Sequence, residues 1–181
     1  LAARGIHVIV HSHRNPEPAR QTVHTIRAAG GSAEQVTFDV TDQEITSTTL
    51  KDLVRDAPIQ IVVSNAGIYD DAPLVAMTSA QWNRVIDVSL NGFFNVTQPL
   101  LLPMLRTGWG RIVAISSVAG VMGNRGQSNY AAAKSGLHGA IKSLALECAS
   151  RGVTANAVAP GIIASQDTLA QFPAEKVKNL V

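Results

Sequence analysis

The sequence predicts an α/β protein built on a doubly wound parallel sheet, and three observations support this prediction. Short runs rich in β-branched residues alternate with longer amphipathic stretches along the chain. Most of the short runs are apolar on both faces, as in parallel strands that helices cover on both sides. Glycines at 30–31, 108 and 152 mark the ends of the helix-like stretches. Such strand–helix alternation implies right-handed crossovers between parallel strands.

The expected elements follow one another in a regular order. Residues 6–12 (IHVIVHS) form a β-branched run, and the amphipathic stretch 17–29 that follows ends at a Gly pair. The same logic assigns the remaining strands and helices. We expect strands at 35–40, 59–65, 110–117 and 152–160, and helices at 44–55, 80–105 and 129–149.

Composition excludes several classes of function. A formal net charge of +2 over 181 residues is too small to favour nucleic acid binding. Cys148 is the single cysteine, so no internal disulfide can form, which fits a reducing, cytoplasmic compartment. We find no signal peptide and no apolar run long enough for a membrane span. The four histidines before residue 25 do not group with acids or cysteine, so we expect no metal site.

Polar and glycine residues gather where the expected strands end. In a doubly wound sheet the ligand lies beyond the carboxyl ends of the strands, so these residues should share one edge. They are Ser12, His13 and Arg14, then Asp39, then Asn65, Ala66 and Gly67, then Ser116 and Ser117, and finally Pro160 and Gly161.

Tyr130 and Lys134 are the strongest candidates for chemistry. They lie four residues apart in a predicted helix and therefore share a face. An ammonium beside a phenol favours the phenolate, which makes such a pair useful for proton transfer near neutral pH. Ser117 ends the preceding strand and could hydrogen-bond the same substrate oxygen. A Tyr–Lys pair by itself is more often surface decoration, but a strand-end Ser at the ligand edge favours catalysis.

Four short motifs resemble those of the short-chain dehydrogenase/reductase family: NYAAAKSG, SNAG, ISSVAG and VAPG. The stretch GNRGQSNYAAAKSGLHGAIKSLA is most similar to the bacterial β-ketoacyl-[acyl carrier protein] reductases of that family. The resemblance covers essentially the whole chain and implies a Rossmann-like, three-layer α/β/α fold. It also implies that residues 1–181 are one dinucleotide-binding domain, incomplete at both ends. The first strand with its Gly-rich turn and the C-terminal region would lie outside the chain.

The resemblance assigns roles to the catalytic candidates. Tyr130 would be the acid/base, Ser117 would steady the substrate carbonyl, and Lys134 would hold the nicotinamide ribose. The family's fourth residue is an Asn, and Ser89 stands at that place in RVIDVSLNGFF. Ser89 holds the water that the Asn would hold, or the proton relay through that water is altered, or Ser89 is a helix residue without a catalytic part.

NADP(H) is the expected cofactor. The strand-end position that carries an Asp in NAD-selective proteins is Ser12 here, and His13 and Arg14 follow it. A guanidinium without a neighbouring carboxylate suits a 2′-phosphate, although Arg14 could also be merely solvated. The resemblance adds the other cofactor contacts: Asp39 and Val40 at the adenine, Asn65, Ala66 and Gly67 beneath the cofactor, Pro160, Gly161 and Ile163 at the nicotinamide, and Ser165 at the phosphates.

The predicted reaction is NADPH-dependent reduction of a 3-oxoacyl-[acyl carrier protein] in fatty-acid synthesis. An acidic carrier would meet Arg151, with Arg106 close by, and the resemblance implies a homotetramer. One alternative is reduction of another ketone, a sugar or a free thioester. An alternative of another class is a nucleotide-binding scaffold with weakened catalysis, which the replacement at Ser89 would explain.

Overall fold

All strands in the described part of the chain run parallel. The structure is a computed structural model, and it describes residues 1–163. The α/β class is confirmed, and each strand lies within two residues of its expected start and three of its expected end. The strands are β1 (Val8–Ser12), β2 (Ala33–Thr37), β3 (Ile61–Ser64), β4 (Gly110–Ile115) and β5 (Val153–Val158).

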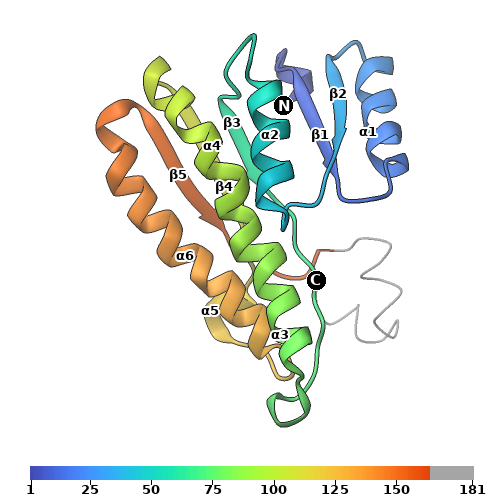
Figure 1. Cartoon of the computed structure of the whole chain (residues 1–181), viewed down its shortest axis with the longest axis vertical. Coiled ribbons are helices and arrows are strands. Elements are labelled where there is room, and N and C mark those ends of the chain that lie inside the picture. The colour runs from blue at the N-terminus through green and yellow to red at the C-terminus, as the bar shows by residue number, and fades with distance from the viewer. Residues whose placement is uncertain (164–181) are drawn as a thin grey trace.

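These strands form two sheets rather than one (Figure 1). β1 pairs with β2, and β4 lies between β3 and β5. In the doubly wound order 3-2-1-4-5-6, a strand that precedes the others in sequence lies in the middle. The described strands fit positions 3-2 and 4-5-6 of this order. Position 1 falls between β1 and β3, which explains why they are not paired with each other.

Helices connect the strands, close to where the sequence predicts them. They are α1 (Glu17–Ala28), α2 (Gln43–Leu53), α3 (Ser79–Ile86), α4 (Gly92–Thr107), the short α5 (Ala119–Met122) and α6 (Ser128–Cys148). The chain also forms short 3-10 turns: η1 (Ala2–Arg4), η2 (Leu74–Ala76) and η4 (Ala149–Arg151).

Local sequence signals account for several helix ends. The Asp42 carboxylate accepts a hydrogen bond from the backbone of Ile45 and caps α2. Thr78 and Gln81 form a capping box at the start of α3. Gly108 ends α4 in the left-handed conformation, which glycine adopts without steric cost.

The predicted helix 80–105 is interrupted. A π-helical turn, η3 (Asp87–Asn91), separates α3 from α4. Such turns insert one extra residue into the helical repeat and often occur at functional sites. The sequence pattern did not show it, because a single π turn barely changes the spacing of apolar residues.

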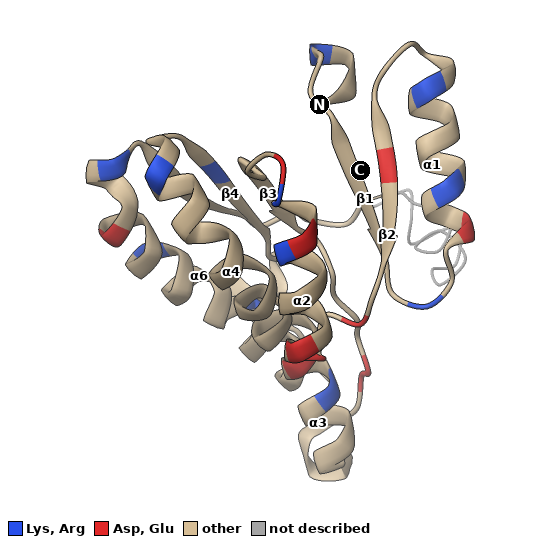
Figure 2. Ribbon diagram, turned by 45° about the horizontal axis from the view of Figure 1, so that its top comes forward, with Lys and Arg blue, Asp and Glu red and all other residues tan. Residues whose placement is uncertain are grey.

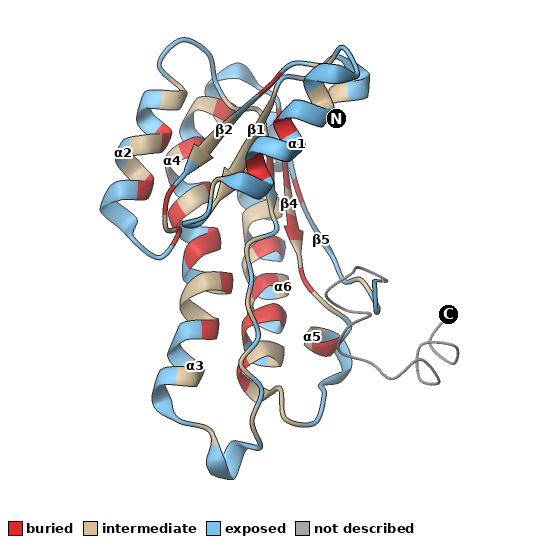
Figure 3. Ribbon diagram, turned by 90° about the vertical axis from the view of Figure 1, so that its right-hand side faces the viewer, coloured by how far each residue is buried: buried red, intermediate tan, exposed pale blue. Residues whose placement is uncertain are grey.

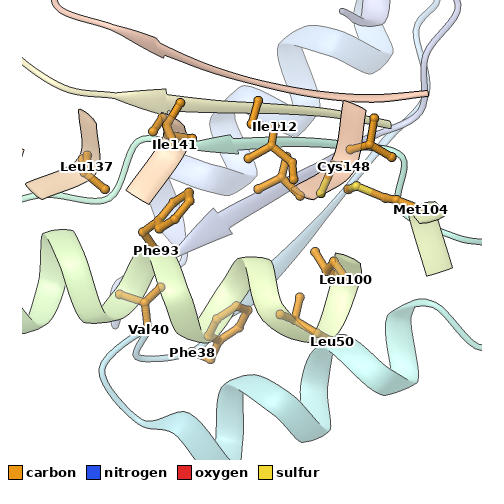
Figure 4. Packing of buried hydrophobic residues seen from close by; sticks show 14 residues of the cluster. Phe38, Val40, Leu50, Phe93, Leu100, Met104, Ile112, Leu137, Ile141 and Cys148 are labelled. Carbon is orange, nitrogen blue, oxygen red and sulfur yellow. The ribbon is translucent and has the colours of Figure 1, made fainter. Parts of the chain in front are cut away.

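One main core joins β3–β4–β5 to the helices on one side of that sheet. Ile112, Met104 and Leu137 are almost fully buried there, and Leu50 brings α2 against α4 (Figure 4). The long helices α4 and α6 run side by side and bury one face each (Figure 3). α1 packs against β1 and β2, away from this group.

The sequence predicts helices on both faces of the strands, but in the described part of the chain one face of β3–β4–β5 is exposed. β5 alternates between buried and exposed residues at its start, and its last three residues are exposed. Val63 and Val158 are each 48% exposed, so within residues 1–163 the helices cover one face of β3–β4–β5. Within the same range, no helix is both long and apolar enough to cross a bilayer.

Candidate active site

Lys134 is buried inside the fold although it carries a charge. Its side chain is 3% exposed, and its Nζ donates to the carbonyl of Ile115 at 2.8 Å. Ser116, the next residue of the β4 end, donates from Oγ to the carbonyl of Lys134 at 2.9 Å. Burial lowers the pKa of Lys134 below its ordinary value. The end of β4 therefore fixes both the backbone and the ammonium of this residue.

Tyr130 lies one turn before Lys134 on the same face of α6. The Lys134 Nζ is 5.6 Å from the centroid of the Tyr130 ring, so the predicted pair is brought together. Ser117 follows Ser116 directly, and its Oγ accepts from the backbone of Ala119 at 3.2 Å. That bond uses a lone pair of the oxygen, which leaves the hydroxyl able to donate to a ligand.

The turn after β4 lies unusually close to α6. A Cβ added to Gly120 would come within 2.8 Å of the Lys134 carbonyl carbon and 2.9 Å of the Ser135 nitrogen. Any residue larger than glycine at position 120 must displace backbone. Gly120 therefore sets the separation between the Ser117 turn and the helix that carries Tyr130 and Lys134.

Ser89 and Gly67 complete this cluster. A Cβ added to Gly67 would lie 3.1 Å from the Lys134 Nζ and 3.5 Å from the Ser89 Oγ, so three elements converge on one point. Ser89 is 1% exposed and is placed by the π turn. Among the described residues, no group hydrogen-bonds its hydroxyl. A buried polar atom of this kind usually has a water or ligand partner.

A second group of predicted residues gathers where β1 and β2 end. Ser12 Oγ and Thr37 Oγ1 are 2.9 Å apart, and His13 Nε2 lies 2.9 Å from an Asp39 carboxylate oxygen. The Asp39 carboxylate also accepts from the backbone and the hydroxyl of Thr41. The backbone bond from Thr41 is the main cause that lowers the pKa of Asp39 to about 2.

An open cavity of about 540 Å³ lies beside this second group. It is lined by the end of β1 and the first turns of α1, including Ser12, His13 and Arg14, and its lining contains no carboxylate. Hydroxyl, imidazole and guanidinium donors without an acid form a set that suits a phosphate group. Asp39 is outside the lining and is held by His13 and Thr41.

The other predicted contacts are placed as follows. Val40 is in the core cluster, with its carbonyl bonded to Asn95, and not on the cavity lining. Asn65 and Ala66 precede Gly67 in the loop after β3. Pro160 accepts from the backbone of Val118 at 2.9 Å, and Gly161 and Ile163 follow it. Ser165 lies outside the described residues.

Sequence reasoning placed Ser116 at the ligand edge but missed its anchoring role, and it missed the other three residues that support the cluster. Ile115, Ser116, Gly120 and Asn129 act through a carbonyl, a hydroxyl, a close approach and an amide. All four stand inside or beside the motifs already singled out. Their roles depend on contacts between β4, α5 and α6, which spacing along the chain does not reveal.

The predicted carrier contacts lie at the opposite end of the sheet. Arg106 is in the last turn of α4 and Arg151 in η4, and both are exposed. Gly108 and Gly152 touch, which brings these two ends together. Figure 2 shows basic segments of α4, α6 and β4 gathered there. α6 spans 21 residues, roughly 30 Å, between this basic end and Tyr130.

Known proteins resemble the chain over most of its length. A family model described as short chain dehydrogenase matches residues 1–176. A 3-oxoacyl-[acyl-carrier-protein] reductase FabG of Aggregatibacter actinomycetemcomitans is 38% identical over all of this chain and 76% of its own length. A 3-oxoacyl-[acyl-carrier-protein] reductase of Synechocystis is 44% identical, covering 93% of this chain and 68% of its own.

A solved structure shows the same fold. A gluconate 5-dehydrogenase from Burkholderia cenocepacia, crystallised with NADP and tartrate, superposes with a TM-score of 0.88 and is 30% identical. The match covers 97% of this chain and 69% of that one.

Proposed function

The chain belongs to the short-chain dehydrogenase family, and from this premise we propose that it reduces a ketone with NADPH. The observation that carries the proposal is the buried Lys134 beside Tyr130, tied to the strand end that presents Ser117. The chain is therefore an oxidoreductase whose site residues are Ser117, Tyr130 and Lys134.

The residues present fit a phosphorylated nicotinamide dinucleotide. At Gly67, the absence of a side chain leaves room over the Lys134 ammonium, where the ribose hydroxyls would be held. The cavity at Ser12, His13 and Arg14 offers donors and no acid to a 2′-phosphate. The solved relative with bound NADP supports the same choice. When bound, the nicotinamide supplies the hydride.

The protein's own groups act on the substrate oxygen. Ser117 donates a hydrogen bond to the carbonyl oxygen and orients it. The Tyr130 hydroxyl donates its proton to that oxygen as negative charge develops there. Lys134, held by Ile115, keeps its positive charge beside the phenolate that remains. Because these groups are fixed before substrate arrives, little reorganisation is needed at the moment of reaction.

A 3-oxoacyl thioester on acyl carrier protein is the substrate that the similarity favours, because both reductases described above are named for their action on this substrate. This activity would place the protein in fatty-acid synthesis in the cytoplasm. A sugar acid is the second candidate, because the superposed structure is a gluconate dehydrogenase. The two are separated by measuring NADPH oxidation against acetoacetyl thioesters and keto-gluconate.

The protein would act as a homotetramer. The outer faces of the long helices leave large apolar side chains exposed, namely Phe94 and Leu102 of α4 and Leu146 of α6. Contact with another copy through these helices would cover them.

Tyr130→Phe tests the proposed function. The variant keeps the ring that packs beside Lys134 and removes only the proton donor. We expect kcat for NADPH-linked reduction to fall about 10²–10⁴-fold while the Kd for NADPH stays within about twofold. Retention of most of the activity would contradict the proposal. A nucleotide-binding scaffold predicts no appreciable reductase activity in either form and equal NADPH affinity.

A further inference from the structure

Asn129, the residue before Tyr130, connects three separate elements. It is completely buried. Its Nδ2 donates to the carbonyl of Asp70 at 3.0 Å and to the carbonyl of Gln81 at 3.2 Å. Its Oδ1 accepts from the backbone N–H of Tyr130 at 2.8 Å. One amide thus joins the loop after β3, helix α3 and the first turn of α6.

The chemistry of these partners requires an amide in one orientation. Two of them are carbonyl oxygens, which need donors, and the third is an N–H, which needs an acceptor. A flipped amide would face like groups at all three contacts. Aspartate would present oxygen to the carbonyls of Asp70 and Gln81, and alanine would reach none of the three.

The bond to Tyr130 fills a gap in the helix. The N–H groups of a first helical turn have no carbonyl four residues earlier to bond. The bond from Ala131 to Gln127 at 2.7 Å is the first of α6, so Tyr130 comes just before it. The Gln127 side chain does not cap the helix and instead donates to Asp71. Asn129 therefore supplies the acceptor that keeps Tyr130 helical.

The loop that receives Asn129 is itself held in place. The Asp70 carboxylate accepts from Gln81 at 3.1 Å and from Arg84. These bonds, the one from Gln81 foremost, lower the pKa of Asp70. The backbone of Ala72 also donates to Gly126, just before α6. The Asp70 carbonyl is thus presented to Asn129 by a fixed loop.

We propose that Asn129 is a positioning residue that holds Tyr130 at the place from which it donates its proton. The inference rests on the proposed function, because it takes Tyr130 as the acid. Lys134 has its own anchors at Ile115 and Ser116. Loss of Asn129 therefore displaces Tyr130 first and leaves the ribose-binding ammonium in place. The expected signature is a fall in kcat without a rise in the KM for NADPH.

Asn129→Ala in the full-length protein provides the test. We expect kcat to fall about 10- to 100-fold, as misplacement of a reacting group by an ångström does, with the KM for NADPH within about twofold. Val153→Ala is the stability-matched control, because Val153 is a buried residue at the opposite end of the sheet. It should lower the melting temperature to a similar degree and leave kcat unchanged.

Asp70→Ala is the second variant. It removes the carboxylate that holds the loop after β3, and so weakens the contact between the Asp70 carbonyl and Asn129. It should lower kcat about fivefold to tenfold, and its combination with Asn129→Ala should lower log kcat by less than the sum of the two effects. If Asn129→Ala does not fold, Asp70→Ala decides alone.

The inference is overturned if Asn129→Ala behaves like Val153→Ala, if the KM for NADPH rises as much as kcat falls, or if Asp70→Ala leaves kcat unchanged. Failure of the proposed function is a different result, namely substantial activity in Tyr130→Phe or no reductase activity in the parent protein.

Discussion

At the scale of single residues, Ser89 is almost completely buried, and its hydroxyl has no hydrogen-bond partner within residues 1–163. Its Oγ faces Gly67 beside the Lys134 ammonium. The family resemblance implies an Asn here that helps to hold a water. A serine hydroxyl reaches less far, so it can hold a water close to its own Cβ but cannot replace the amide's second contact.

Ser89→Ala tests whether the hydroxyl of Ser89 contributes to catalysis. If the hydroxyl orders a water beside Lys134, its removal should lower kcat about tenfold. If it has no partner, its removal should leave kcat unchanged and raise the free energy of unfolding by about 1 kcal/mol. Thr97→Val is the matched control, because Thr97 Oγ1 is also buried without a partner among the described residues. It should stabilise the protein without changing kcat.

A second variant at this position tests the replacement directly. Ser89→Asn restores the residue that the resemblance implies and should preserve or improve turnover. A collapse of kcat with an unchanged melting temperature would contradict the view that Ser89 serves as the family Asn does. Equal kcat in the wild type and Ser89→Ala would assign Ser89 no catalytic part.

The charge on Lys134 destabilises the protein without its cofactor. Burial lowers the pKa of Lys134 in the folded state below its value in the unfolded chain. The unfolded state then binds more protons between the two pKa values, so stability rises with pH through that window. The cost of burying the charge is therefore present below the lowered pKa of Lys134 and is lost as the pH rises towards about 10.5.

Lys134→Met should raise the melting temperature by a few degrees at pH 7 while abolishing reduction. The difference from wild type should narrow as the pH approaches 10.5. Lys142→Met is the control, because Lys142 is exposed on the same helix and should change the melting temperature little at either pH. A Lys134→Met protein that is less stable at pH 7 would show that the bond to Ile115 outweighs the cost of burial.

At the scale of elements, the close approach of the α5 turn to α6 determines the geometry of the site. Gly120 lies against the backbone of Lys134 and Ser135, whereas a Cβ on Gly139 of the same helix would meet nothing within 4 Å. Substitution of these two glycines by alanine therefore distinguishes the effect of crowding, expected only at Gly120, from the effect of helix propensity, expected at Gly139.

Gly120→Ala should lower kcat about tenfold or more and cost about 1–3 kcal/mol of stability, because backbone must move to admit the methyl group. Gly139→Ala should stabilise the protein by about 0.5–1 kcal/mol and leave kcat unchanged. Steady-state kinetics and chemical denaturation measure both. Similar small effects from the two variants would show that the turn can shift freely.

At the scale of the whole molecule, the basic end and the proposed catalytic end lie on opposite edges of the sheet. The exposed Arg106 and Arg151 lie in the last turns of α4 and η4, whose ends approach each other at Gly108 and Gly152. Arg111 donates a hydrogen bond to the carbonyl of Gly152 at the same end. An acidic carrier protein would be attracted to this end, whereas a small free substrate would not.

Charge reversal at Arg106 and Arg151 together tests carrier docking. We expect kcat/KM for a carrier-bound substrate to fall about tenfold and to lose its dependence on salt, because surface attraction is screened within about 10 Å at 0.1 M salt. The same variant should reduce a free acetoacetyl thioester normally. Arg20→Glu, on exposed α1, is the control. If wild-type rates with the carrier do not depend on ionic strength, electrostatic docking is wrong.

The sequence by itself determined the order and type of the main elements. Periodicity places α6 within one residue of its bounds, and the strand ends predict which residues share an edge. It also singled out Ser117, Tyr130 and Lys134, because a pair four apart on a helix and a strand-end hydroxyl are readable from spacing alone. These features are local, so the chain carries them in its own pattern.

Only the tertiary structure decided how these parts meet. The π turn that buries Ser89, the anchoring of Lys134 by Ile115 and Ser116, and the amide of Asn129 all depend on residues distant in sequence. Hydrogen bonds and close approaches between elements are set by packing in three dimensions, which leaves no regular spacing along the chain.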